Sequence, residues 1–292
     1  MLAKGKMLII GGAEDVGDKE PPFPLRDTGE LQRYEILREL FNASKNKKIE
    51  IITSGSRFQE EVKERYQKAF HDIGYKAPGF IHIEDKMEAR DKHYLSRVEA
   101  ADAVFFTGGD QFRLATIIGG TSLIDFIRQR YIDDRHFIVA GTSAGAMVMS
   151  SIMITEGGLA EALIEQDLKT SSGLGFIQNC IIDTHFIKRG RFARLAHAII
   201  INPDQLGVGL GEDTALIIKN GSEAECRGSG MVVIIDGKHI RQTNITGVRD
   251  NEPVYVENLK VHLLVKGCRF SIKTRKLYNP TKVTPKRGNK DE

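Results

Sequence analysis

The stretch HFIVAGTSAGAM, residues 136–147, runs from an apolar segment into a series of small residues. Its first half has the length and composition of a buried strand, and AGAMVMSS, residues 144–151, is typical of the start of a helix. A buried strand that turns directly into a helix is the repeating unit of an α/β sheet. The stretch therefore indicates an α/β fold, and it places Ser143 alone between two glycines at the turn.

Four apolar runs upstream have the same character, and each ends in glycine, serine or an acidic residue. They are KMLIIGG (6–12), KKIEIITSGS (47–56), GFIHIED (79–85) and AVFFTGG (103–109). Segments 28–45 and 57–74 between them carry apolar residues at helical spacing. Crossover helices of this length join parallel strands in right-handed units and cover both faces of the sheet. We therefore predict a mostly parallel, doubly wound sheet.

The pattern changes after the quoted stretch. We predict a strand over 179–186, a helix over 189–200 and a pair of strands over 206–221. Residues 225–272 are short β-type runs joined by Gly and Asn turns, which predicts an antiparallel β extension packed on the main sheet. Because no linker rich in Pro, Gly or Ser divides the chain, residues 1–272 are predicted to form a single domain.

The composition is that of an ordinary globular protein, with 292 residues of which 41% are hydrophobic and 28% charged. Residues 273–292 hold seven Lys or Arg and two acids, a net +5, so the rest of the chain carries about −2 (3 − 5). We predict a basic, disordered tail there, although such a tail can also bind nucleic acid or an acidic surface. No zinc-finger spacing or aromatic RNA-binding motif supports a nucleic-acid partner.

The sequence also indicates where the protein resides. No apolar run approaches the roughly 18 residues of a membrane-spanning helix, and the N-terminus lacks a signal-peptide pattern. We therefore expect a cytoplasmic protein with no membrane partner. Cys180, Cys226 and Cys268 are odd in number and lack C-x-x-C spacing, so we expect buried, reduced thiols rather than disulfides or a zinc site.

Gly141, Ser143 and Gly145 form a G-x-S-x-G pattern between the predicted strand and helix. A nucleophile elbow needs this spacing, because the strained turn that exposes the serine hydroxyl leaves room only for tiny side chains on either side. The alternative is a structural turn of small residues. The strand before it and the helix after it favour the nucleophile.

A serine nucleophile requires a base, and His185 is the histidine that closes a predicted strand beside charged neighbours. Three residues are candidates for the acid that orients it. Glu212 ends the next strand, Asp183 lies on the same strand face as His185, and Glu161 lies in the irregular stretch after the elbow. Glu212 is our first choice, which gives the chain order Ser, His, acid rather than the Ser, acid, His of α/β-hydrolases.

The glycine pair in FTGGDQFRL, residues 106–114, would let the backbone approach a reacting carbonyl. The amides of Gly109 and Ala144 could then form an oxyanion hole, with the side chain of Gln111 in the same cleft. The alternative is a glycine turn capped by Asp110.

Cationic residues cluster next to the predicted base. They are Lys188, Arg189, Arg191 and Arg194, together with Arg113 after Gln111. Guanidinium groups recognise carboxylates by paired hydrogen bonds, so the cluster predicts a substrate that carries carboxylates. The alternative is an ordinary charged helix face.

The motifs IIGGAED, FTGGDQ, GTSAGA, DTHFIKRGRFARL and GEDTA resemble, in order and over roughly residues 5–275, the serine peptidase family that contains cyanophycinase and aspartyl dipeptidase (peptidase E). The resemblance implies a three-layer α/β/α sandwich related to class I glutamine amidotransferases, and a homodimer. It implies cleavage of cyanophycin, a poly-aspartate with arginine on each side-chain carboxylate, to β-Asp-Arg dipeptides. No metal or organic cofactor is implied.

By this resemblance Ser143 matches the nucleophile, His185 the base and Glu212 the acid. The positions that match the polymer-holding pocket are Gln111, Asp183, Arg189, Arg191 and Arg194. The chain departs from the family at Thr184, where glutamine is common. Two other functions remain open: a peptidase E-like enzyme for Asp-X dipeptides, and a non-catalytic binder of acidic polymers. The glutaminase relatives have cysteine where this chain has Ser143.

Overall fold

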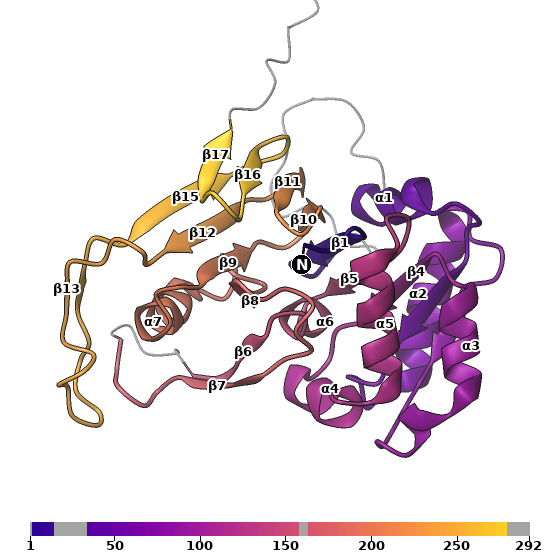
Figure 1. Cartoon of the computed structure of the whole chain (residues 1–292), viewed down its shortest axis with the longest axis horizontal. Coiled ribbons are helices and arrows are strands. Elements are labelled where there is room, and N and C mark those ends of the chain that lie inside the picture. The colour runs from indigo at the N-terminus through magenta and orange to yellow at the C-terminus, as the bar shows by residue number, and fades with distance from the viewer. Residues whose placement is uncertain (1, 15–33, 158–162, 279–292) are drawn as a thin grey trace, which may run out of the picture.

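A computed structural model describes residues 2–14, 34–157 and 163–278, and Figure 1 shows how their elements are arranged. The main sheet has nine strands in the order β17-β16-β11-β10-β1-β5-β4-β2-β3. These are β1 (Lys6–Ile10), β2 (Ile49–Ile52), β3 (Gly79–Ile81), β4 (Ala103–Phe106), β5 (Ile138–Thr142), β10 (Thr214–Lys219), β11 (Glu223–Gly228), β16 (Arg269–Ser271) and β17 (Lys276–Tyr278). The five strands β1, β5, β4, β2 and β3 are mutually parallel. The four strands β10, β11, β16 and β17 each pair antiparallel with their neighbours.

Helices cover both faces of the parallel strands. They are α1 (Glu35–Ala43) and α2 (Gln59–Asp72) on one face, and α3 (Lys92–Ala100), α4 (Gln111–Ile118) and α5 (Ser122–Asp133) on the other. Side chains alternate along each strand, so that Leu8 and Ile10 pack with α1 and α2 while Met7 and Ile9 lie in the opposite core. This is the three-layer α/β/α arrangement, and the predicted fold class is confirmed.

A second sheet is formed by four strands from the C-terminal half of the chain. Its strands are β15 (Lys260–Leu264), β12 (Val232–Asp236), β9 (Leu206–Leu210) and β8 (Cys180–Asp183), in that order. β8 and β9 are parallel, and α7 (Phe192–Ile201) packs on them through Leu195 and Ile199. Because β9 leads directly into β10, the two sheets are joined at this point (Figure 1).

Short elements complete the described chain. They are the helix α6 (Ala144–Met147), the 3-10 turn η1 (Glu88–Arg90), the hairpin β6 (Ile152–Glu156) with β7 (Lys169–Ser172), and the pair β13 (Gln242–Thr243) with β14 (Val256–Glu257). The hairpin lies below β8 in Figure 1, in the stretch where the sequence pattern loosened. Glu161, one of the candidate acids, lies outside the described residues.

Residues 225–272 contain antiparallel β structure, as predicted, but it is divided between two sheets, since β11 and β16 extend the main sheet while β12 and β15 belong to the second. The predicted start of the tail at residue 273 is wrong, because β17 pairs with β16 and Arg275 forms an ion pair with the buried Asp236. The tail prediction now concerns residues 279–292, which lie outside the described part of the chain.

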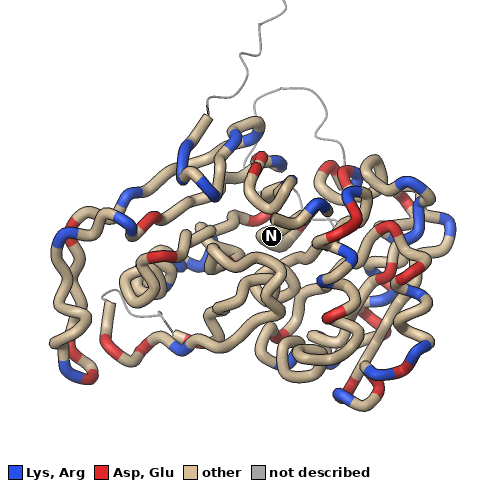
Figure 2. Tube along the Cα trace, viewed as in Figure 1, with Lys and Arg blue, Asp and Glu red and all other residues tan. Residues whose placement is uncertain are grey.

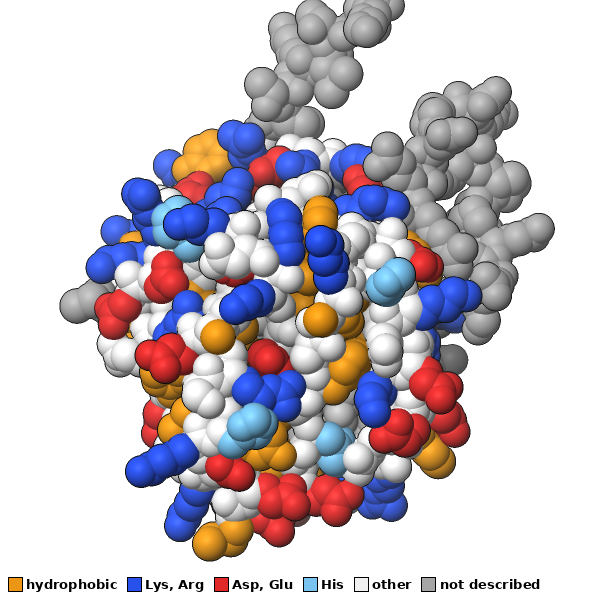
Figure 3. Space-filling view, turned by 90° about the vertical axis from the view of Figure 1, so that its right-hand side faces the viewer, with side chains coloured by type: hydrophobic (Ala, Val, Ile, Leu, Met, Phe, Trp, Pro, Cys, Tyr) orange, Lys and Arg blue, Asp and Glu red, His pale blue; other side chains and the backbone are white. Residues whose placement is uncertain are grey.

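The charges are distributed over the whole trace, with Lys and Arg frequent along the C-terminal strands at the upper left of Figure 2. On the helical side, seen in Figure 3, basic and acidic side chains are interspersed. Within the described residues, no helix combines the length and apolar character needed to cross a membrane. All three cysteines are buried and unpaired by disulfides, as expected from the sequence.

Candidate active site

Ser143 occupies the turn between β5 and α6. Its backbone has φ 51° and ψ −120°, a conformation that is strained for a residue with a side chain. A Cβ atom on Gly141 would collide with the carbonyl oxygen of Gly145, and one on Gly145 would collide with that of Phe106. The G-x-S-x-G spacing is therefore required sterically, as a nucleophile elbow requires.

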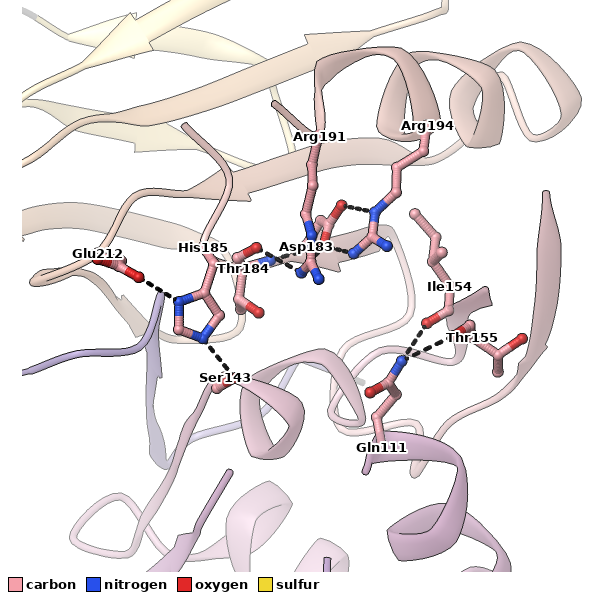
Figure 4. Close-up of polar contacts among 10 residues, drawn as sticks. All are labelled: Gln111, Ser143, Ile154, Thr155, Asp183, Thr184, His185, Arg191, Arg194 and Glu212. Atoms are coloured by element: carbon pink, nitrogen blue, oxygen red, sulfur yellow. Dashed lines mark hydrogen bonds and ion pairs between the residues drawn. The ribbon is translucent and has the colours of Figure 1, made fainter. Parts of the chain in front are cut away.

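The structure brings the three residues that we chose from the sequence into one hydrogen-bonded row (Figure 4). The hydroxyl oxygen of Ser143 lies 2.9 Å from Nε2 of His185, and Nδ1 of His185 lies 2.8 Å from Oε1 of Glu212. Ser143 comes from the main sheet, whereas His185 follows β8 and Glu212 follows β9 of the second sheet. The site thus forms where the carboxyl ends of strands from two sheets meet.

The environment of Glu212 favours its charged form. Partial burial acts to raise the pKa of Glu212, but hydrogen bonds from Lys188 and His185 outweigh it and lower that pKa below its ordinary value. Nζ of Lys188 lies 2.9 Å from Oε2 of Glu212. A carboxylate in this position can hold the imidazole in one orientation and stabilise it when it carries a second proton.

The glycine pair after β4 lies beside the serine. A Cβ atom on Gly108 would lie 3.4 Å from Cβ of Ser143, and Gly109 has φ 138°, a conformation that favours glycine. Ala144 begins α6, so its backbone N–H lies in the first turn of a helix, where N–H groups have no acceptor within the helix. The segment is also a glycine turn followed by a helix cap, as the alternative interpretation held, since the Asp110 carboxylate accepts from the backbone N–H of Arg113 at the start of α4.

The side chain of Gln111 does not extend free into the cleft. Its Nε2 donates to the carbonyl oxygens of Ile154 and Thr155 at 3.1 and 3.3 Å, and so ties the start of α4 to the hairpin strand β6 (Figure 4). The hydrogen-bond donors of this amide are thereby engaged by the backbone. Its carbonyl oxygen is the atom that could meet a ligand.

Asp183 and two of the predicted pocket arginines form an internal ion cluster (Figure 4). The carboxylate of Asp183 is fully buried and accepts from Nε of Arg194 at 2.6 Å and from Nη1 of Arg191 at 3.1 Å. Arg191 also donates to the carbonyl of Thr184 at 2.8 Å. Burial lowers the pKa of Arg191, and the Asp183 carboxylate acts against that shift.

This cluster offsets part of the positive charge that the cationic residues bring to the site. Asp183 balances one of the two guanidinium charges, and Glu212 balances Lys188. Arg189 lies exposed on the turn between β8 and α7. These ion pairs could not be predicted from the sequence, because the position of Asp183 two residues before His185 does not show which cationic side chains will pack against it.

No group of three or more His, Cys, Asp or Glu side chains suited to a metal ion occurs in the described part of the chain. The polar groups at the site are a hydroxyl, an imidazole and a carboxylate in one row, which is the set used when a hydroxyl acts as a covalent nucleophile. An α/β fold with such a row at the carboxyl edge of its parallel strands is typical of the serine hydrolases.

Comparison with known proteins agrees with this class. The profile of peptidase family S51 matches residues 25–225. A cyanophycinase of Trichormus variabilis is 35% identical over 274 residues, covering 93% of this chain and 87% of its own. A cyanophycinase of Geminocystis herdmanii is 34% identical over 273 residues, covering 93% of this chain and 95% of its own.

More distant similarities extend to other peptidases. A peptidase E of Nostoc is 30% identical over 171 residues, which is 56% of this chain and 64% of its own. Among solved structures, a peptidase from an acI-B1 actinobacterium superposes with a TM-score of 0.63 at 21% identity, covering 92% of this chain and 97% of its own. That likeness shows the shared fold.

The chain belongs to peptidase family S51, and it is a serine-type peptidase. One feature of the site was not predicted from the sequence. The imidazole of His185 lies directly against Gly12, so that a Cβ atom there would come 2.6 Å from Nε2. The glycine pair in IIGGAED could have signalled such a close approach.

Proposed function

We propose that this chain hydrolyses cyanophycin and releases β-Asp-Arg dipeptides. The observation that carries the proposal is the similarity to cyanophycinases over more than nine tenths of the chain, together with the Ser143, His185 and Glu212 row. The full length of the similarity favours cyanophycin over small dipeptides, because the peptidase E relative matches only 56% of the chain.

The proposed reaction begins with attack of the Ser143 oxygen on a backbone carbonyl of the polymer. Nε2 of His185 takes the hydroxyl proton, and the amides of Gly109 and Ala144 stabilise the negative charge on the carbonyl oxygen. The tetrahedral intermediate collapses to an ester on Ser143 while the imidazolium donates its proton to the departing amine. Glu212 holds the imidazole in place throughout.

Water completes the cycle. His185 removes a proton from a water molecule, the hydroxide attacks the ester carbonyl, and the second tetrahedral intermediate releases the carboxylic acid as the proton returns to Ser143. The sum is one peptide bond and one water consumed, and one amine and one carboxylic acid formed. None of these steps needs a metal ion or an organic cofactor.

The arginines have two different roles in this proposal. Arg189, which is exposed, meets the free carboxylate of an arginine branch. Arg191, Arg194 and Asp183 form one preorganised side of the binding site. Arg191 is partly exposed, and the three side chains together carry one net positive charge. Gln111 offers its carbonyl oxygen to a branch guanidinium. We also propose that the enzyme acts as a homodimer in the cytoplasm.

The test is incubation of the purified protein with insoluble cyanophycin and analysis of the soluble product by mass. Release of β-Asp-Arg that is lost in Ser143→Ala is the expected result. Cleavage only of small Asp-X dipeptides would instead assign a peptidase E-like activity. Binding to the granules without any release would assign a non-catalytic binder of the polymer.

A further inference from the structure

Three successive backbone carbonyls at the end of β1 each accept a hydrogen bond from a different segment of the site. The pairs and their N···O distances are Ser143 to Ile10 at 3.0 Å, His185 to Gly11 at 2.8 Å and Asp213, the residue after Glu212, to Gly12 at 2.9 Å. All three donors have positive φ, at 51°, 49° and 46°. One short segment thus contacts the backbone of every part of the Ser-His-Glu row.

The same segment also contacts the side chain of the base. A Cβ atom on Gly12 would collide with Cε1 of His185 and would lie 2.6 Å from Nε2 and 3.1 Å from Nδ1. Gly12 itself has φ 98°, which a side chain would disfavour. The imidazole of His185 therefore packs so closely against Gly12 that no side chain fits between them.

The next residues tie this segment to the strand that carries the nucleophile. Glu14 is 2% exposed, and its Oε2 accepts from the hydroxyl of Thr142 at 2.6 Å. Its Oε1 accepts from the hydroxyl of Tyr66 on α2 at 2.8 Å. Thr142 directly precedes Ser143 and pairs with Ile10 in the sheet, so Glu14 closes a loop from β1 back to the elbow.

We propose that residues 10–14 act as a template that aligns the three catalytic segments, with Gly12 and the buried Glu14 as positioning residues. Glu14 is too buried to reach a polymer, so it acts through Thr142 on the position of the Ser143 hydroxyl. Positioning matters at this scale, because a displacement of about 1 Å can reduce the rate by roughly a hundredfold. The inference rests on the proposed catalytic roles of Ser143 and His185.

The two hydroxyls bound to Glu14 provide a matched pair of variants. Thr142→Val and Tyr66→Phe each remove one buried hydroxyl donor from the same carboxylate, but only the first breaks the link to the nucleophile strand. We expect Thr142→Val to lower kcat by about 10- to 100-fold with little change in KM. Thr142→Ser, which keeps the hydroxyl, should restore activity, and Tyr66→Phe should retain it.

Labelling of Ser143 by phenylmethylsulfonyl fluoride serves as a second readout that does not require cyanophycin. We expect its rate to fall in Thr142→Val and to be retained in Thr142→Ser and Tyr66→Phe. If wild-type protein is labelled but does not cleave cyanophycin, the proposed function is rejected. The labelling rates of the variants still test the template in that case. Equal losses in Thr142→Val and Tyr66→Phe, or no loss in either, would overturn the template.

Gly12→Ala tests the contact with the base through a spectroscopic signature. The proton shared between His185 Nδ1 and Glu212 should give a strongly downfield NMR resonance, and a methyl group against the ring should shift or abolish that resonance in protein that remains folded. The resonance should be unaltered in Tyr66→Phe. An unchanged resonance in folded Gly12→Ala would contradict the role of Gly12, whatever substrate the enzyme cleaves.

Discussion

Ser143, His185 and Asp213 are non-glycine residues that share a positive φ, between 46° and 51°. Each such residue costs of order 1–3 kcal/mol unless its surroundings enforce it, and such strain is concentrated at functional sites. Here the three amides are held by consecutive carbonyls of β1 and the loop after it. Three of the positive-φ residues of the described chain therefore lie at the site where the Ser143 hydroxyl and the His185 imidazole are 2.9 Å apart.

Glu212 gives a prediction at this scale. Glu212→Gln keeps the shape of the side chain but removes the charge that holds the imidazole in one tautomer, so we expect kcat to fall by about 10²- to 10⁴-fold. Steady-state kinetics on cyanophycin measures this. Glu156→Gln is the matched control, since Glu156 also pairs with a lysine, Lys169, but both of these side chains are exposed. Equal kinetics in Glu212→Gln and wild type would refute the role of Glu212.

The lowered pKa of Glu212 also predicts a pH dependence of stability. A carboxyl whose pKa is lower in the folded state stabilises the protein above its unfolded pKa, and this contribution is lost as the pH falls through the folded pKa. The stability advantage of wild type over Glu212→Gln should therefore be constant near neutral pH and shrink below the ordinary value of 4.5. Urea titrations at several pH values measure it, and an advantage that grows on acidification would contradict the shift.

The sequence was sufficient to predict that Ser143, His185 and Glu212 lie together, because each follows an apolar run. The parallel pairing of β8 with β9 brings the last two side by side. It was insufficient for Asp183, whose partners are Arg191, just before α7, and Arg194 within that helix. Whether a carboxylate faces the cleft or an internal arginine depends on how the helix docks, and no local pattern encodes that docking.

Among the elements, α7 and β8 are held together by charge as well as by apolar packing. Asp183 ends β8, Arg194 lies in the first turns of α7, and both side chains are buried. Asp183→Asn would leave two guanidinium groups without their counter-charge, so we expect a loss of about 3–5 kcal/mol in the free energy of unfolding. Denaturant unfolding followed by circular dichroism measures the loss.

The control for that variant is Asp125→Asn, which removes an exposed carboxylate paired with Arg128 at 3.2 Å. A surface pair of this kind contributes little, and its removal should change stability by less than about 0.5 kcal/mol. If the two variants were equally stable, the Asp183 cluster would not hold α7 on β8.

Strands were easier to predict than helices in this chain. Every strand that we predicted up to residue 221 has a counterpart, because short apolar runs bounded by Gly and Asp are a strong local signal. The helices α3, α4 and α5 were not assigned, since α3 is short and largely polar and α4 and α5 follow one another across a Gly-Gly-Thr turn. The division of strands between two sheets is a long-range property that periodicity does not specify.

At the scale of the whole molecule, the last strand separates a structural segment from the terminal residues. β17 pairs with β16, and Arg275 binds both Asp236 and the carbonyl of Asp204, so residues 273–278 belong to the fold. Composition alone could not show this, because a Lys- and Thr-rich segment can form an edge strand as readily as a solvated tail.

Two truncations test this boundary and the prediction that the domain is single. Removal of residues 279–292 should leave the thermal midpoint and the activity unchanged, as expected of a solvated tail. Removal of residues 273–292 deletes β17 and the Arg275 ion pair, and should lower the midpoint by several degrees. Calorimetry should show one transition in both cases. Equal midpoints for the two truncations, or two separate transitions, would contradict this account.

The most direct measurement of the central claim is the mass of the enzyme during turnover. A short soluble cyanophycin oligomer is mixed with wild-type protein, quenched in acid within the first turnover and digested. We predict that the peptide containing Ser143 gains the mass of a whole number of Asp-Arg units as an ester, and that no peptide of Ser143→Ala does. An adduct on another residue, or continued release of β-Asp-Arg by Ser143→Ala, would contradict the account.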